Sequence, residues 1–398
     1  MDVQMHETHD TTSQPREVAV VLGRVPSLSL RELEGALVRR GSTITDLNVA
    51  SGVAIVKADP TPDETWFHSL GGATKFGAVA ARIPVGNPIR LTDAIVAAAE
   101  GVETVGVSVI GVPMTPAQLA AEVKQRADSV KRYVLPRTGT VLTAAESKAL
   151  VGKRSGRELF VYRTKEEDIV LAIEAAQDID AFTERDRNAP VNDPVRGMLP
   201  TKLARMMVNI ALGLADRNAW RPVLLDPFVG TGRVLMEGAL LGAHVIGADK
   251  DPAAARATND NLAWLARTHR LDAASMADAA TAIPVERIAG LVSPGTVDAI
   301  VTEPFLGPPQ RQPLIPAQRD ELFRELTPLY HALFQAGQKL LKSQAGVVVV
   351  FPTVGEVSLL DRLVDRLPGM GYHVLDSIRV ARPDHIISRT IGIIERKK

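Results

Sequence analysis

The residues with the clearest chemical potential lie between positions 226 and 249. Asp226 ends a short apolar run and is followed by Gly230 and Gly232, after which a helical pattern begins. Such apolar runs are typical of strands buried on both faces, and glycines allow the backbone to approach a ligand closely. A second apolar run ends in Asp249, where an acid can bind ribose hydroxyls. The sequence therefore predicts a strand, turn and helix that form part of a nucleotide site.

Several kinds of site use such a turn, and Asp226 discriminates between them. A dinucleotide site needs a third glycine, but Leu235 stands at that position, and the carboxylate of Asp226 would repel a pyrophosphate. A phosphate-binding P-loop is excluded because no Gly-Lys-Ser/Thr follows. The carboxylate instead favours a ligand that carries a cationic amino group and a sulfonium. A purely structural turn is the remaining alternative, and the matched acid Asp249 disfavours it.

The order of these residues carries a resemblance to a known family. Asp226-Pro227-Phe228-Val229-Gly230-Thr231-Gly232, then Glu237-Gly238-Ala239 and then Asp249, resembles the S-adenosylmethionine site of class I methyltransferases. It is especially similar to the branch that methylates the exocyclic amine of guanine in tRNA, in which an N-terminal THUMP-type RNA-binding region precedes the methyltransferase domain. The resemblance assigns cofactor binding to Asp226, Pro227, Gly230, Gly232, Asp249 and Asp278.

This resemblance implies a fold and two binding partners. The expected fold is α/β, with the doubly wound sheet of class I methyltransferases, a reversed C-terminal edge strand and a preceding α+β THUMP-like region. The expected cofactor is S-adenosyl-L-methionine, and the expected macromolecular partner is a tRNA. Asp278 would contact the adenine amine after a third strand over 271–276, and a helix cap is the alternative for this residue.

A second motif, Thr302-Glu303-Pro304-Phe305, closes a predicted strand over 297–302. Carboxyl ends of parallel strands share one edge of a sheet, so Glu303 should lie beside the two acids of the first motif. By the resemblance, the acceptor is a guanine amine, whose two hydrogens the Glu303 carboxylate and the Pro304 carbonyl can accept. Phe305 can stack on a flipped base. The predicted catalytic residues are therefore Glu303, Pro304 and Phe305.

This chain departs from the family pattern at the second motif. The usual order is Asp or Asn, then two prolines and an aromatic residue. Glu303 matches the acid and Pro304 the first proline, but Phe305 replaces the second proline and Leu306 the aromatic residue. The longer side chain of Glu303 displaces its carboxylate, which alters the geometry offered to an amine. A rigid proline-rich loop with a structural glutamate is the alternative.

A basic segment stands in the N-terminal half. Between Lys124 and Lys165 there are eleven Lys or Arg residues against three Asp or Glu, although the formal net charge of the whole chain is zero. A local basic face is the electrostatic signature of a phosphate-binding surface, and a solvated face balanced by acids elsewhere is the alternative. The predicted RNA-binding residues are Lys124, Arg126, Lys131, Arg132, Lys153 and Arg154.

Composition shifts divide the chain into four predicted regions. They are a disordered tail over 1–15, an N-terminal α+β THUMP-like RNA-binding region over 16–180, a linker over 181–199 and the methyltransferase domain over 200–398. The linker is rich in charge and proline, which is typical of an interdomain connection. The β-α-β order before it, with the basic segment inside, resembles a THUMP module.

Particular elements are predicted from local signals. Ser29 and Glu32 predict a capping box at the start of a helix over 29–40. Other predicted elements are a helix from Thr115 to Tyr133, a helix over 356–367, and two strands over 372–381 and 386–395 joined by Arg382-Pro383-Asp384-His385. These last two strands form the predicted antiparallel pair at the end of the sheet.

Composition excludes several classes of protein. The 398 residues suggest two or three domains. The absence of cysteine excludes disulfides and cysteine zinc sites and fits a reducing cytoplasm. No run approaches the roughly 20 apolar residues of a membrane span, the polar N-terminus does not read as a signal peptide, and the histidine spacing indicates no metal site. We expect a cytoplasmic protein without metal or membrane association, and a partner protein or a homodimer stays open.

The function favoured by these patterns is methyl transfer from S-adenosylmethionine to the exocyclic N2 amine of a guanosine in tRNA. One alternative is a methyltransferase of another amine, such as adenine N6 in DNA or RNA or a protein glutamine. A second alternative is a non-catalytic RNA-binding partner subunit that keeps the cofactor fold. The variant motif at Glu303 favours this last alternative, whereas the retained Asp226, glycines and Asp249 disfavour it.

Overall fold

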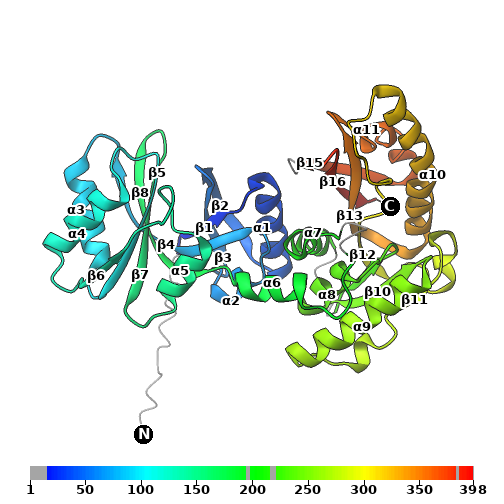
Figure 1. The fold of residues 1–398 in the computed structure, drawn as a ribbon, viewed down its shortest axis with the longest axis horizontal. Coiled ribbons are helices and arrows are strands. Elements are labelled where there is room, and N and C mark those ends of the chain that lie inside the picture. Colours follow the sequence, from blue (N-terminus) through cyan, green and yellow to red (C-terminus); the bar gives the residue numbers. More distant parts are fainter. Residues whose placement is uncertain (1–15, 194–197, 216–220, 382–384, 398) are drawn as a thin grey trace, which may run out of the picture. The chain divides into compact units, whose positions relative to one another are not determined.

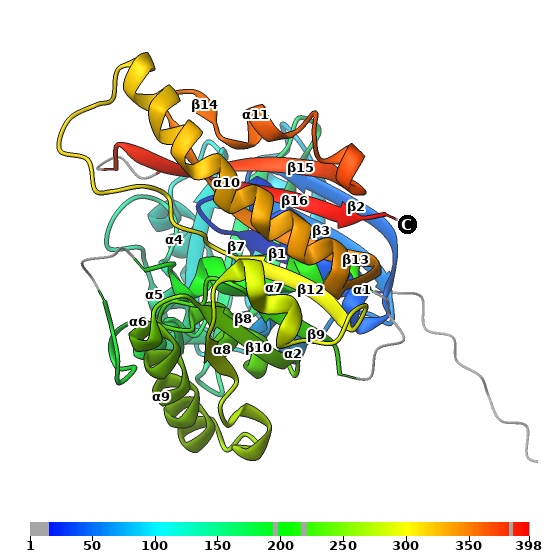
Figure 2. The same cartoon turned by 90° about the vertical axis from the view of Figure 1, so that its right-hand side faces the viewer.

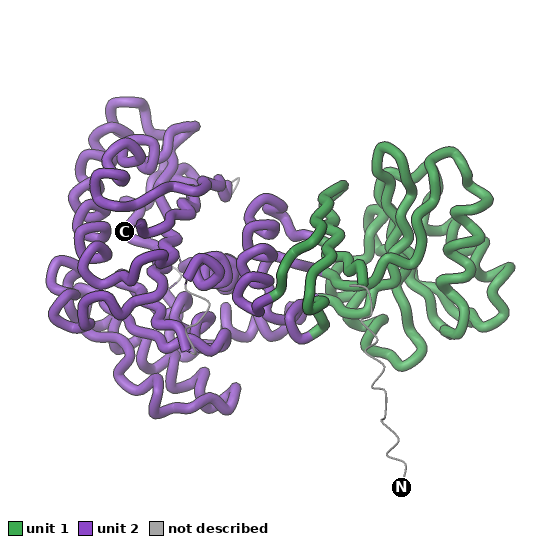
Figure 3. The backbone as a smooth tube through the Cα atoms, turned by 180° about the vertical axis from the view of Figure 1, so that it is seen from behind, with its two compact units in different colours: residues 1–21, 42–64, 75–176 green, residues 22–41, 65–74, 177–398 purple. Residues whose placement is uncertain are grey.

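The chain forms two compact units (Figure 3). The computed structural model describes residues 16–193, 198–215, 221–381 and 385–397. The predicted tail over 1–15 lies outside these residues, as do parts of the predicted linker (194–197) and of the connection between the last two strands (382–384). The first unit comprises Met1–Val21, Ser42–Glu64 and Lys75–Ala176, and the second comprises Leu22–Gly41, Thr65–Thr74 and Gln177–Lys398.

The first unit is built on one sheet. Its strands follow the order β2-β3-β1-β4-β8-β7-β5-β6. The strands are β1 (Val18–Leu22), β2 (Thr43–Ala50), β3 (Val53–Asp59), β4 (Ala73–Pro84), β5 (Thr104–Ile110), β6 (Arg132–Val134), β7 (Gly156–Arg163) and β8 (Glu167–Ala176). The helices are α3 (Pro88–Ala99), α4 (Pro116–Arg126) and α5 (Ala144–Val151). The sheet mixes parallel pairs, such as β5 with β7, and antiparallel pairs, such as β7 with β8.

The second unit contains a sheet in the order β11-β10-β9-β12-β13-β16-β15, with β14 paired to β13. The strands are β9 (Val223–Asp226), β10 (His244–Asp249), β11 (Ala280–Ala282), β12 (Val297–Thr302), β13 (Leu341–Val354), β14 (Val357–Ser358), β15 (Tyr372–Val380) and β16 (Ile387–Arg396). The helices are α1 (Pro26–Arg40), α2 (Glu64–His68), α6 (Ile179–Arg187), α7 (Thr201–Leu214), α8 (Arg233–Leu240), α9 (Pro252–His269), α10 (Pro316–Leu340) and α11 (Leu360–Leu363).

Helices cover both faces of this second sheet, as a doubly wound α/β fold requires. Alternate residues of β13 enter two different cores because successive side chains of a strand point to opposite faces. Val348 and Val350 join the core that contains α7, whereas Val349 and Phe351 join the core that contains α10. Figures 1 and 2 show α7 and α10 on opposite sides of the sheet. The predicted α/β class is confirmed.

The position of the reversed strand corrects the prediction. β16 is antiparallel to both β13 and β15, and it lies inside the sheet, while β15 forms the edge. The sequence explains this order. β16 is buried on both faces along most of its length, and its residues 391–394 are apolar, which suits an interior strand. β15 alternates buried and exposed residues, which suits a strand at an edge.

Helix α1 belongs to the second unit, in contrast to the predicted N-terminal region over 16–180. It crosses α7 at close range, where a Cβ on Gly35 would stand 2.7 Å from the carbonyl oxygen of Asn209. The predicted capping box is wrong because Pro26 starts the helix earlier, at its first turn. Glu32 is therefore buried inside the unit, where it accepts hydrogen bonds from the backbone of Gly71 (2.6 Å) and Gly72 (2.7 Å).

Other predicted boundaries also shift. The predicted linker over 181–199 begins with α6, which Asp178 caps. The helix expected from Thr115 to Tyr133 ends at Arg126, so Lys131 and Arg132 lie outside it. The helix expected over 356–367 is reduced to β14 and the short α11. The strand expected over 271–276 is a 3₁₀ turn at Ala274–Met276, and β11 starts later.

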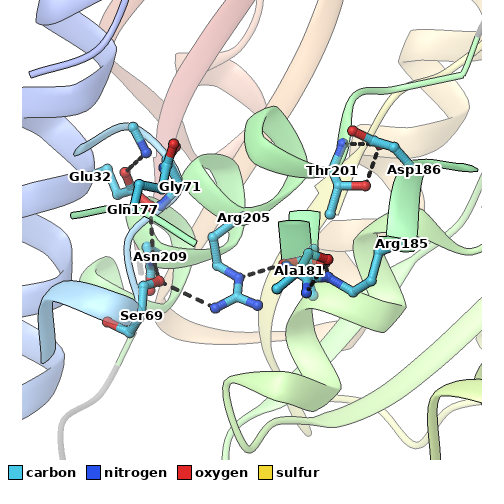
Figure 4. A network of polar contacts seen from close by, with 12 residues as sticks. Glu32, Ser69, Gly71, Gln177, Ala181, Arg185, Asp186, Thr201, Arg205 and Asn209 are labelled. Atoms are coloured by element: carbon cyan, nitrogen blue, oxygen red, sulfur yellow. Dashed lines mark hydrogen bonds and ion pairs between the residues drawn. The ribbon is translucent and has the colours of Figure 1, made fainter. Parts of the chain in front are cut away.

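A buried ionic network ties α6, α7 and α8 together (Figure 4). The carboxylate of Glu237 on α8 accepts hydrogen bonds from Arg185 Nε (2.7 Å) and Arg205 Nε (2.5 Å), and all three side chains are almost fully buried. Arg185 also donates to the carbonyl of Ala181 at 2.8 Å. One carboxylate thus compensates two guanidinium groups that water cannot reach.

Glu237→Gln should destabilise the second unit by about 3–5 kcal/mol, because it leaves two buried guanidinium groups without their counter-charge. Urea denaturation followed by circular dichroism measures the change. Glu321→Gln is the matched control, since its ion pair with Arg324 is largely exposed, and it should leave the unfolding midpoint unchanged. If Glu237→Gln unfolds at the same urea midpoint as wild type, the two buried arginines do not need this carboxylate as a counter-charge.

Candidate active site

Three carboxylates end three neighbouring strands of the second sheet. Asp226 is the last residue of β9, Asp249 is the last residue of β10, and Glu303 follows β12. These strands are parallel, with Asp226 beside Gly247 of β10 and Leu225 beside Ile300 of β12. Their carboxyl ends therefore meet at one edge, which is where open α/β sheets bind ligands. We call this the carboxyl edge.

Asp226 is 2% exposed, and its Oδ1 accepts hydrogen bonds from the Thr302 hydroxyl (2.6 Å) and the Phe228 backbone N–H (3.1 Å). Burial raises the pKa of Asp226 to about 7, and the charges of Asp249 and Glu303 act in the same direction. The two hydrogen bonds lower this pKa, but they compensate the burial only in part. Pro227, the next residue in the chain, is also buried.

The glycine turn joins Asp226 to Asp249. Gly230 adopts a φ of 54° and donates its N–H to Asp249 Oδ2 at 3.1 Å. Gly232 adopts a φ of 83°, and a Cβ there would stand 2.8 Å from the side chain of Thr258. Both conformations favour glycine. A Cβ on Gly230 would meet nothing within 4 Å, so the turn has open space on its outer side.

Two asparagines on α9 hold the surroundings of this turn, and the sequence indicates them only as residues disfavoured inside a helix. Asn261 is fully buried, donates to the carbonyls of Thr231 (2.8 Å) and Val191 (2.9 Å), and accepts from the Val191 N–H. Asn259 pairs with both backbone groups of Ala280 at 2.9 Å. The two asparagine side chains thus form hydrogen bonds with backbone groups of two loops and of strand β11.

Asp278 does not reach the carboxyl edge. In the register of β10 and β11, Ala282 is the residue beside Asp249, so Asp278 precedes the strand at its opposite end. It is exposed and adopts a φ of 51°. The physical reason lies in the late start of the strand: Asp272 caps the preceding 3₁₀ turn at Ala274, and Asn259 fixes the strand to begin at Ala280.

The predicted catalytic residues differ in exposure. Pro304 is buried, whereas the ring of Phe305 is 59% exposed. Glu303 is 13% exposed at its side chain and forms a bidentate ion pair with Arg389 of β16, at 2.5 Å from Nε and 3.3 Å from Nη2. Sequence reasoning missed Arg389. The signal that could have indicated it is an arginine in the first half of a predicted strand whose later part, 391–394, is apolar.

Four of the basic residues predicted to bind RNA meet at one end of the first sheet. Arg132 begins β6 and lies beside Thr104 at the start of β5, and Gly156 at the start of β7 lies beside the same residue. Because these strands are parallel, the pairs 131–132 and 153–154 lie at the same end of the sheet. Their side chains are exposed. We call this group the basic edge.

The remaining two basic residues lie at the end of α4. The ammonium of Lys124 is 5.8 Å from the ring centre of Tyr133, which is 45% exposed. An exposed aromatic ring beside cations suits the stacking of unpaired bases. Arg126 pairs with an acid of α3, and Lys131 pairs with Glu103, so acids offset part of the charge. The first unit therefore carries both charge and a stacking surface.

The carboxyl edge fits an organic cation better than an anion or a metal. Asp226, Asp249 and Glu303 give it negative charge, and the open side of Gly230 gives it space. Within the described ranges, no group of three or more His, Asp or Glu side chains is arranged to hold a metal ion. In the same part of the chain, no helix is long and apolar enough to cross a membrane.

Comparisons with known proteins agree with this geometry. Residues 192–307 match the family model described as RMKL-like, methyltransferase domain. This segment includes the glycine turn and all three carboxylates. The matched segment lies within the second unit and covers less than half of the chain. The fold is also that of a crystal structure of TrmN from Thermus thermophilus, with a TM-score of 0.56 and 17% identity over 96% of this chain and 99% of that one.

Two curated relatives share the name tRNA (guanine(10)-N2)-dimethyltransferase. The protein of Methanocaldococcus jannaschii is 39% identical over 116 residues, which are 28% of this chain and 29% of the relative. That of Pyrococcus abyssi is 30% identical over 156 residues, or 38% of this chain and 41% of the relative. The matches therefore span less than half the length of these relatives.

Asp226→Asn should stabilise the second unit at pH 8 by an amount on the order of 4 kcal/mol. The folded-state pKa of Asp226 is raised above its ordinary value of 3.8 to about 7, so folded Asp226 favours the protonated form. The free energy of unfolding of the wild type therefore decreases as pH rises from 3.8 to about 7. Asparagine carries no charge, so the variant does not show this decrease. Thermal unfolding of both proteins at pH 5 and pH 8 measures the difference, which should shrink at pH 5. A variant less stable than wild type at pH 8 contradicts the assignment.

Proposed function

We propose that this protein transfers a methyl group from S-adenosylmethionine to the exocyclic N2 amine of a guanosine in tRNA. The observation that carries the proposal is the carboxyl edge, where Asp226, Asp249 and Glu303 surround an open glycine turn. The methyltransferase domain supports the reaction class. The shared name of the curated relatives supports the tRNA guanine amine as acceptor.

The glycine turn is the proposed cofactor site. S-adenosylmethionine, when bound, supplies an electrophilic methyl group on a sulfonium. Asp226 faces the positive charge of such a ligand, and the Asp249 carboxylate accepts hydrogen bonds from ribose hydroxyls. Gly230 and Gly232, with Pro227 before them, keep side chains out of the space that the ligand needs. Asp278 has no part in this assignment because it lies at the other end of β11.

Glu303, Pro304 and Phe305 form the proposed acceptor site. The Glu303 carboxylate and the Pro304 carbonyl accept the two hydrogens of the amine and so fix the direction of its nitrogen lone pair. Holding reacting atoms in place is a large part of such catalysis. Glu303 takes up the proton that the methylated amine releases. The exposed ring of Phe305 stacks on the base.

The first unit is proposed to hold the RNA as a THUMP-like module. The basic edge supplies cations for phosphates, and Tyr133 supplies a stacking surface beside Lys124. This proposal assigns RNA binding to the first unit and methyl transfer to the second, and the second unit also includes Leu22–Gly41 and Thr65–Thr74 from the predicted N-terminal region. The proposed substrate and the absence of cysteine favour a cytoplasmic location.

A second function has one observation in its favour. The Glu303 carboxylate is already paired with Arg389. Such a pair is expected if this chain is a partner subunit that binds RNA and keeps the cofactor fold without catalysis. A methyltransferase of a different amine, such as adenine N6 or a protein glutamine, would use the same carboxyl edge. The retained glycine turn and its acids favour an active enzyme over the partner subunit.

Incubation of the purified chain with methyl-labelled S-adenosylmethionine and unmodified tRNA should yield labelled N2-methylguanosine, identified by mass spectrometry of the digested nucleosides. Asp249→Ala should weaken cofactor binding by about 1.5–3 kcal/mol through the loss of charge-assisted hydrogen bonds, as measured by calorimetry. Asp249→Asn keeps one acceptor oxygen and should lose less.

The outcomes of this assay separate the alternatives. Label on another nucleoside would keep the fold and the cofactor but replace the acceptor. Cofactor binding without any label on tRNA would favour the partner subunit or a protein acceptor. If the chain neither binds S-adenosylmethionine nor labels tRNA, the proposed function is wrong.

Charge reversal at the basic edge should weaken tRNA binding at every salt concentration. The double variant Arg132→Glu with Lys153→Glu removes two cations. The negative slope of log affinity against log salt should therefore become shallower by roughly 0.7–0.9 for each lost phosphate contact. Filter binding across a salt series measures the slope. Lys165→Glu is the control, because this exposed residue lies past the opposite end of β7. Equal slopes for all three proteins would remove the basic edge from the RNA-binding surface.

A further inference from the structure

Arg389 reaches the carboxyl edge because β16 runs against the other strands. The antiparallel direction places the start of β16 where the parallel strands end, and Arg389 lies beside Pro352 near the end of β13. β13 separates β12 from β16, so the ion pair spans two strand spacings, about 10 Å between strand axes. Two long side chains are needed to meet across that distance.

The geometry of the pair fixes the carboxylate. The Arg389 side chain is 10% exposed, and Nε and Nη2 contact different oxygens of Glu303. Such a fork sets the plane of the carboxylate as well as its position. A carboxylate can accept about four hydrogen bonds, so the pair leaves acceptor sites on both oxygens. An amine can therefore bind Glu303 while Arg389 stays in place.

The surroundings of Glu303 explain why it needs a cation. Asp226 on β9 and Asp249 on β10 share its edge, and Asp226 interacts with both other carboxylates. From α10, the buried phenol of Tyr330 also lies within the field of Glu303; burial raises the pKa of Tyr330 well above its usual value, and the Glu303 charge adds to this. The guanidinium of Arg389 supplies the positive charge that these neighbouring groups lack.

We propose that Arg389 is a positioning residue that holds the Glu303 carboxylate in a fixed orientation as the acceptor for the exocyclic amine. This role rests on the proposed function and adds a residue outside the matched methyltransferase segment. It also accounts for glutamate at a position where the family pattern has aspartate or asparagine. A shorter acid would not reach Arg389 across the end of β13.

The test compares Arg389→Met and Arg389→Lys with wild type in the tRNA methylation assay at saturating cofactor. Arg389→Met should lower kcat/KM at least tenfold, because the Glu303 carboxylate loses the fork that fixes its plane. Arg389→Lys should restore part of the activity, because lysine keeps a positive charge beside Glu303 but not the fork. The cofactor Kd should stay within twofold of wild type in both variants. Arg379→Met, which removes an arginine of β15 from an exposed ion pair, should change nothing.

A purely structural role predicts a different pattern. Wild-type activity in Arg389→Met, no gain of activity in Arg389→Lys over Arg389→Met, or a parallel loss of cofactor binding would overturn the proposal. If wild type methylates no tRNA, the proposed function fails. If wild type methylates tRNA and Arg389→Met does so equally well, only the role of Arg389 fails.

Discussion

The structure of the second unit depends on compensating carboxylates where water is scarce. Asp226 is almost fully buried at the end of β9, and two hydrogen bonds satisfy only one of its oxygens in the described structure. Burial of a charge without full compensation destabilises the fold. The rest of the carboxyl edge reduces this cost by different means. Asp249 accepts the backbone N–H of Gly230, and Glu303 receives the guanidinium of Arg389.

The same physical constraint governs the supporting helices. Glu237 lies one turn beyond the start of α8 and is compensated by arginines from α6 and α7. This arrangement fixes the helix that begins at the glycine turn. Glu32 of α1 has backbone N–H groups and Asn209 of α7 as its partners, and burial raises its pKa to about 7. Buried charges thus connect the cofactor turn to helices distant in sequence.

The sequence predicts the site where its chemistry is local. Asp226, the two glycines and Asp249 lie on consecutive elements of one βαβ unit, so spacing alone indicates their proximity. Glu303 follows from the rule that parallel strands end at a shared edge. Asp278 was placed wrongly because the start of β11 depends on Asn259, a contact from another element. The capping box at Ser29 failed for a similar reason, since Glu32 finds stronger partners in tertiary structure. Arg389 lies far from Glu303 in sequence, and no local pattern connects them.

The direction of β16 has a consequence for the order in which the site is assembled during synthesis. The glycine turn, β10 and β12 leave the ribosome well before Arg389, because β16 is the last strand of the sheet. A nascent chain can therefore form the glycine turn while Glu303 still lacks its counter-charge. The interior position of β16 also means that β15 cannot join the sheet until that last strand inserts beside β13. The ion pair of Glu303 and the closure of the sheet are completed in the same step.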